Sequence, residues 1–147
     1  MLFKRISRAS AETIFMVVQN VSGGTVTADH NVVFDTGASA DGVRVTQAAT
    51  NTVQAYAGVA DADIANNAFG LIQVYGFRSR VLVDTNTTAL ELGLPLEPFN
   101  ASFALRGAGK SGSDSDSKHK AFAFSVAAVA SSGSSSTSFQ KAFIRAL

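Results

Sequence analysis

The chain of 147 residues contains no cysteine and no tryptophan, and it has only two prolines and two histidines. Without cysteine, neither a disulfide nor a thiolate metal site can support the fold. This absence fits a reducing compartment, or an assembly stabilised by contacts between many copies. A chain of this length buries roughly 70% of the surface that its unfolded form exposes, which is enough for one hydrophobic core. We therefore expect a single domain.

The net charge is only +1, so neither sign of charge is in large excess. The net charge therefore does not indicate a highly charged polymer as a partner. The distribution of charge is uneven. Residues 1–11 carry Lys4, Arg5 and Arg8 and no acid, whereas residues 12–105 carry three arginines against nine acids. Basic residues dominate again from residue 106 onward. Two basic ends and an acidic middle would allow copies of the chain to bind head to tail, or a basic arm to bind an acidic lattice of other subunits. The alternative is that both termini are basic and simply solvated.

No segment is predicted to enter a membrane or to direct secretion. The apolar run 14–18 lies between Glu12 and Gln19, and it is far too short to span a bilayer. The first residues lack the cleavage pattern of a signal peptide. They contain arginine and no acid, as transit peptides do, but we favour an ordinary N-terminal arm. We expect residues 1–12 to form an N-terminal arm, with one or two helical turns in 3–12 as an alternative, and residues 13–147 to form one β domain.

Apolar residues at helical spacing persist nowhere beyond two turns. Short β-branched and aromatic runs, separated by Gly, Asn, Asp and Ser, occur instead. This pattern is typical of an all-β fold, an antiparallel β-sandwich or a jelly-roll-like barrel. Strands are expected at 13–20, 25–27, 31–35, 43–46, 53–59, 70–77, 80–83, 91–99, 103–105, 121–129 and 139–146.

Four of these segments carry more specific predictions. The continuous apolar run 13–20 predicts a central strand buried on both faces. The alternation in 53–59 predicts one face made of Val53, Ala55, Ala57 and Val59. Gly76 predicts a bulge or a sharp corner between two strands. The two prolines in 91–99 predict an edge strand or an extended arm, because proline cannot donate to a β-ladder.

The C-terminal third predicts a loop followed by a hairpin. Residues 107–120 have almost no apolar content, so we expect a mobile surface loop there. Residues 121–147 predict a hairpin whose phenylalanines face one another, an arrangement that adds ~0.5–1 kcal/mol for each pair. A helix over the alanine-rich segment 121–129 is the alternative to its first strand.

Motifs that suggest catalysis or cofactor binding are incomplete. Residues 104–111 resemble a phosphate-binding loop, but Ala104 replaces the first glycine and no helix is predicted to follow. Asp114 and Asp116 lack the other ligands of a calcium loop. His30 and His119 are far apart in sequence, no zinc-binding histidine pair exists, and no nucleophile–base pair is visible. We expect no catalytic residue, no cofactor and no metal, and hence no enzyme.

Arg78 and Arg80 alternate with their neighbours and are predicted to point to one face of a strand. A guanidinium suits bidentate contact with a partner's carboxylates, and an ordinary exposed strand face is the alternative. Basic residues do not gather on one element with stacking aromatics, so nucleic acid is not an expected partner. The candidate partner-contact residues are Lys4, Arg5, Arg8, Arg78 and Arg80.

The segment 57–77 follows the pattern G-V-x-x-x-x-I-x-x-N-x-x-G-L-x-Q-V-x-G. With Asn20–Thr27 (N-x-S-G-x-T-V-T), Gly93–Pro98 (G-x-x-L-x-P) and the closing Phe143–Leu147, it resembles the capsid decoration (cement) proteins of tailed bacteriophages. The likeness covers roughly residues 13–105. Its motifs mark turns and strand ends and contain no binding code, and the serine-rich loop at 107–118 departs from the pattern.

The resemblance implies a homo-oligomer, a dimer or trimer, of an all-β protein with a jelly-roll, sandwich or β-tulip fold. It implies a location on the capsid exterior of a virion assembled in the host cytoplasm. There the protein would bind the major capsid protein and cement neighbouring subunits through many modest interfaces. The alternatives are a head–tail or tail component and a carbohydrate-binding β-sandwich module. The lack of tryptophan argues against the second alternative.

Overall fold

The computed structural model describes residues 12–37, 40–85, 89–108, 122–130 and 136–146. Within these ranges the chain is all-β, as predicted, and contains no helix, so none that could cross a membrane. The strands are β1 (Ile14–Asn20), β2 (Asn31–Phe34), β3 (Arg44–Thr46), β4 (Tyr56–Ala60), β5 (Phe69–Asp84), β6 (Pro95–Pro98), β7 (Leu105–Gly107), β8 (Ala123–Ser125) and β9 (Thr137–Arg145).

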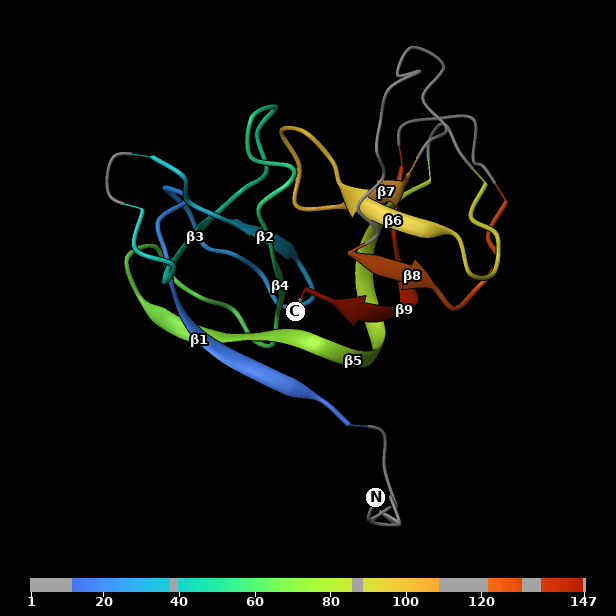
Figure 1. Ribbon diagram of the computed structural model, residues 1–147, viewed down its shortest axis with the longest axis horizontal. Helices are drawn as coiled ribbons and strands as arrows, with labels where there is room; N and C mark the ends of the chain where they lie inside the picture. Colours follow the sequence, from blue (N-terminus) through green and yellow to red (C-terminus); the bar gives the residue numbers. More distant parts are fainter. Residues whose placement is uncertain (1–11, 38–39, 86–88, 109–121, 131–135, 147) are drawn as a thin grey trace, which may run out of the picture.

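The nine strands form one mixed sheet that closes on itself twice. The order is β1-β3-β2-β4-β5-β7-β6-β8-β9, and β5 pairs additionally with β1 and with β9. The first ring therefore consists of β1 to β4 and the first half of β5, and the second ring consists of the second half of β5 and β6 to β9 (Figure 1). The β1–β3 and β5–β7 pairs are parallel, and all other pairs are antiparallel.

The long strand β5 connects the rings because it changes partners along one edge. Its residues 69–75 pair with β1, and its residues 75–84 pair with β9. Gly76 lies at this change with φ of +106°, and a Cβ atom there would lie 2.2 Å from the Glu12 carbonyl oxygen. The predicted corner at Gly76 is therefore present. The chain remains one strand, however, with a register irregularity between Arg78 and Val81 instead of a break.

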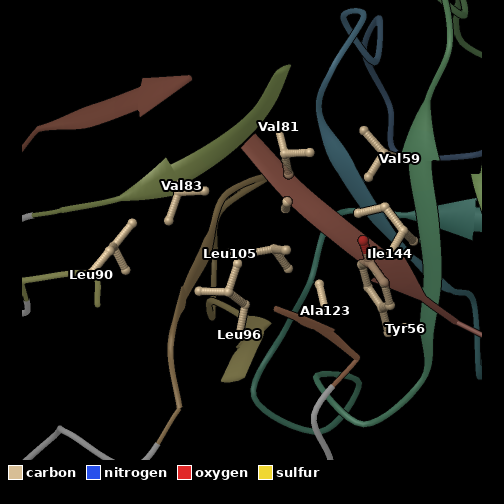
Figure 2. Close-up of a cluster of buried hydrophobic side chains, with 10 residues drawn as sticks. Tyr56, Val59, Val81, Val83, Leu90, Leu96, Leu105, Ala123 and Ile144 are labelled. Atoms are coloured by element: carbon tan, nitrogen blue, oxygen red, sulfur yellow. The ribbon is translucent and has the colours of Figure 1, made fainter. Parts of the chain in front are cut away.

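Each ring has its own hydrophobic core. The first core is built from small side chains: Val18, Val26, Val32, Val45, Ala57, Ala60, Ile64, Ile72 and Val74. The second core contains larger ones: Tyr56, Val59, Val81, Val83, Leu90, Leu96, Leu105, Ala123, Ala142 and Ile144 (Figure 2). Figure 2 shows side chains from β4, β5, β6, β7, β8 and β9 converging on the second core. One chain of this size thus divides its apolar residues between two centres.

Strand β4 is a wall between the two cores, which corrects the alternation predicted for residues 53–59. Ala57 packs in the first core, and Tyr56 and Val59 pack in the second. The alternation breaks at a bulge in the β2–β4 register, where Gly58 adopts φ of +150°. A Cβ atom on Gly58 would lie 2.4 Å from the Gln73 carbonyl oxygen. The strand begins only at Tyr56 because residues 51–54 form a turn.

The prolines of β6 do not place this strand at an edge, contrary to prediction. Strand β6 is paired with β7 on one side and with β8 on the other. Both prolines occupy its ends, where Pro95 accepts a hydrogen bond from the Ala108 amide (2.8 Å). Leu96 between them is buried. A proline can therefore lie in a paired strand where only its carbonyl is needed.

One further segment differs from prediction. Residues 25–27 form no strand, only an isolated bridge between Val26 and Ile64. Within the described part of 121–129, which begins at residue 122, the predicted strand is present as the shorter β8 and the alternative helix is absent. Strand β8 pairs antiparallel with β9 as the predicted hairpin requires, with Phe124 opposite Phe143. The predicted N-terminal arm (all but Glu12) and the predicted mobile loop at 107–120 (all but Gly107 and Ala108) lie outside the described residues.

Candidate interaction surface

Strands β1 and β5 form a two-stranded ribbon with large apolar side chains on its outer side. Phe15 is paired with Gln73, Val17 with Leu71, and Gln19 with Phe69. Because alternate residues of a strand share a face, all six side chains lie on one face of the ribbon. Four of them are exposed: Phe15 (42%), Val17 (58%), Phe69 (66%) and Leu71 (45%). We call these four residues the apolar outer face.

This exposure corrects the prediction that residues 13–20 form a strand buried on both faces. Val18 and Ile72 point into the first core, and Met16 packs partly against it. The alternate residues Phe15 and Val17 point away from that core, and no described residue buries them. A contiguous exposed apolar patch, unlike scattered exposed residues, is a candidate interaction surface.

A groove adjoins the apolar outer face at its Phe15 end. Its volume is about 350 Å³. Its lining residues are Phe15, Asp29, Asp61, Gln73, Phe77, Arg78, Ser79 and Arg80. The groove therefore combines two aromatic walls with a charged floor, next to the apolar ribbon.

Arg78 on β5 forms the floor of this groove, and its side chain is only 11% exposed. Its guanidinium donates to Asp29 Oδ1 (2.8 Å), to Asp61 Oδ1 (3.1 Å) and to the Ala60 carbonyl (2.9 Å). It also donates to Gln73 Oε1 (3.3 Å). These bonds tie the ends of β2 and β4 to β5. The guanidinium of Arg78 is thus bonded within its own chain, which leaves it poorly placed to pair with a partner's carboxylates.

Arg80 lies beside Arg78, and both contact Asp29, so the predicted common direction of the two side chains is present. Arg80 Nε donates to Asp29 Oδ2 (3.1 Å), and its guanidinium lies 4.3 Å from the centre of the Phe139 ring. Its side chain is 61% exposed, so it remains accessible. Lys4, Arg5 and Arg8 lie outside the described residues.

Outside the lining of the groove, Tyr56 is a buried side chain with a polar group and His30 is a half-buried one. The Tyr56 hydroxyl donates to Asn31 Oδ1 (3.1 Å), and burial raises the pKa of Tyr56. His30 stacks on Phe103 with ring centres 5.3 Å apart. Burial lowers the pKa of His30, and Asp29 and Asp63 partly oppose this shift. In the described ranges no three His, Asp or Glu side chains gather as a metal site would require.

The apolar outer face was not predicted from the sequence. A signal was present in the sequence. Residues 14–18 and 69–72 are apolar at nearly every position, whereas a strand buried on one face needs apolar residues only at alternate positions. Such runs predict burial on both sides equally well. Only the pairing of β1 with β5 shows that one side remains uncovered by described residues.

A scan against models of protein families finds no match, and a search of curated proteins finds none. Among solved structures, the chain is similar to the N base of head fiber gp8.5 of bacteriophage phi29. The TM-score is 0.51 at 15% sequence identity, and the match covers 92% of this chain and 96% of that chain. At this identity the likeness shows a shared fold.

Proposed function

We propose that this chain is a non-catalytic structural protein of a tailed-phage head. In this role it binds the outer surface of the capsid shell and holds neighbouring major capsid subunits together. The observation that carries the proposal is the apolar outer face, formed by Phe15, Val17, Phe69 and Leu71. A protein that acts by binding to other subunits needs an exposed apolar surface of this kind and does not need a group of catalytic residues.

The physical basis is repeated burial of apolar area. Each square ångström removed from water contributes roughly 25 cal/mol, so four large side chains give a modest contact. Such contacts become strong when many copies occupy one shell, because rupture must then break several at once. The exposed Arg80 at the edge of the groove would add a charged contact that orients the copy.

Two independent likenesses support this role. The chain has motifs resembling those of capsid decoration proteins in 57–77, and its fold is similar to that of the base of a phage head fiber. The first likeness concerns local sequence, and the second concerns the arrangement of nearly the whole chain. A structural role on the exterior of the phage head is the simplest one compatible with both likenesses.

Cosedimentation with empty, expanded phage heads tests the proposal. We expect saturable binding at a fixed number of copies per shell. Leu71→Lys places a charge on the apolar outer face and should weaken binding by about tenfold or more, since burying an unpaired charge is costly. The matched control is Leu92→Lys, because Leu92 is also exposed but lies in the turn before β6. Equal binding by both variants would contradict the proposed surface.

The basic N-terminal residues provide a second, separate test. We propose that Lys4, Arg5 and Arg8 contact a neighbour, so deleting residues 1–10 should weaken shell binding and leave the fold intact. Unchanged binding would dismiss this part of the proposal. If the full chain fails to bind shells and forms rings or tubes in solution, it is a tail component instead.

A further inference from the structure

The outer edge of β1 is unpaired over most of its length. Residues 14–19 pair with β5 on one edge, whereas β3 covers only Gln19 and Asn20 on the other. Within the described part of the chain, residues 14–18 have no strand on that second edge (Figure 1). Residues 14–18 contain no proline and no charged side chain, two of the features with which proteins protect exposed edges.

The direction of the backbone groups along β1 follows from the hydrogen bonds at its C-terminal end. The Gln19 and Val21 amides donate toward β3, to Val43 and Val45 (3.0 and 2.9 Å), whereas the Asn20 amide donates to Ala68 next to β5 (3.0 Å). Because this direction alternates along a strand, the amides and carbonyls of Phe15 and Val17 point to the open edge. The edge thus presents two donors and two acceptors.

We propose that a second copy of this chain occupies this edge, with the two β1 strands antiparallel about a two-fold axis at Met16. Phe15 then lies opposite Val17 of the second copy. Each such pair exchanges two backbone hydrogen bonds, so all four open groups of each edge are satisfied. This register stops short of Gln19, whose amide is already bonded to β3.

The side chains favour a second copy over a different protein. In this register an aromatic residue faces a β-branched one in both pairs, a favourable cross-strand combination, and no like charges meet. The two copies also place their apolar outer faces side by side in one continuous sheet. The edge is therefore complementary to itself in hydrogen bonds, in side-chain type and in charge.

A cysteine scan tests the register, because the natural chain contains no cysteine. Met16 faces its own counterpart as a non-hydrogen-bonded pair, about 4.5 Å between Cα atoms, which a disulfide can bridge. Val17 is offset from its counterpart by two residues, about 8 Å, which is too far. Under mild oxidation Met16→Cys should form covalent dimers at least about tenfold faster than Val17→Cys. Equal or reversed rates would overturn the register, since Val17 is the more exposed residue.

Two variants test whether the β1 edge forms the dimer. The measurement is the mass of each variant's oligomer in solution. The monomer has a mass of 15.2 kDa, and the wild-type chain should have twice that mass. Val17→Pro removes one open amide and should yield monomers, whereas Leu71→Lys changes the apolar outer face but leaves the edge intact and should remain dimeric. Circular dichroism establishes that both variants are folded. A wild-type mass of one or three copies, or any other combination of variant masses, overturns the proposal.

This inference rests on the open edge of β1 and not on binding to a shell. The two ideas therefore fail separately. Loss of shell binding by Leu71→Lys with the dimer retained concerns the proposed function alone. A monomeric wild-type chain that still binds shells would overturn only the edge pairing.

Discussion

The two rings of this molecule share a strand and differ in how they are filled. The first core consists of Val, Ala and Ile, whereas the second is centred on Tyr56 and three leucines, Leu90, Leu96 and Leu105. The outer surfaces differ as well, because the first ring exposes the apolar outer face and an open edge on β1. The second ring has the larger buried side chains, and the first has the surface suited to a partner.

The contact surface proposed above and the second core draw on different halves of β5. The first half of β5 supplies Phe69 and Leu71 to the exposed face, and its second half supplies Val81 and Val83 to the buried second core. A partner can therefore bind at the first ring without disturbing the residues that fill the second. Four sets of variants test this separation, ordered by the size of the expected change.

Truncation of core residues should destabilise both rings, the second more strongly. Leu105→Ala should lower the free energy of unfolding by about 3–5 kcal/mol, and Val32→Ala by about 2 kcal/mol, because the larger deletion leaves the larger cavity. Chemical denaturation measures both. Since β4 and β5 contribute to both cores, each variant should still unfold in one transition. Two separate transitions would show that the rings are independent.

The buried arginine should matter far more than its exposed neighbour. Arg78→Met leaves Asp29 and Asp61 without their main partner and should cost about 3 kcal/mol of stability. Arg80→Met is the matched control, and should cost less than about 1 kcal/mol because its ion pair is exposed. Equal losses in denaturation experiments would refute the central position given to Arg78.

The polar link between the rings should have a moderate effect. Tyr56→Phe removes the hydroxyl that donates to Asn31 Oδ1 and leaves this buried oxygen without that partner. The expected loss is about 1–3 kcal/mol, since the ring itself still fills the second core. The amide of Asn31 keeps its bonds to the Leu82 and Phe103 carbonyls. A loss near zero would mean that water replaces the hydroxyl.

The smallest effect concerns pH. Burial lowers the pKa of His30 in the folded state below its ordinary value of 6.5, so the unfolded chain binds the proton more readily. Stability should be independent of this group well above pH 6.5 and should fall as the pH drops below it. His30→Phe preserves the stack on Phe103 and should remove this part of the pH dependence. An identical pH profile in denaturation experiments would contradict the assignment.

Much of the strand content could be predicted from local pattern, and the failures have physical reasons. Strands β2, β3 and β9 occur within a residue or two of the predicted positions, because β-branched runs between turn residues are a local signal. The alternation of β4 failed at Gly58, where a bulge shifts the faces. The edge position of β6 failed because its prolines lie only at the ends of the strand.

The local sequence pattern was enough to predict an all-β chain, a corner at Gly76 and a common direction for Arg78 and Arg80. These properties depend on neighbours along the chain. Three other properties could not be predicted from the local pattern: Arg78 bonds within its own chain, β5 belongs to two rings, and Phe15 and Val17 are exposed. Each depends on which distant strand covers a given face, and an apolar run in the sequence is the same whether a neighbour covers it or not.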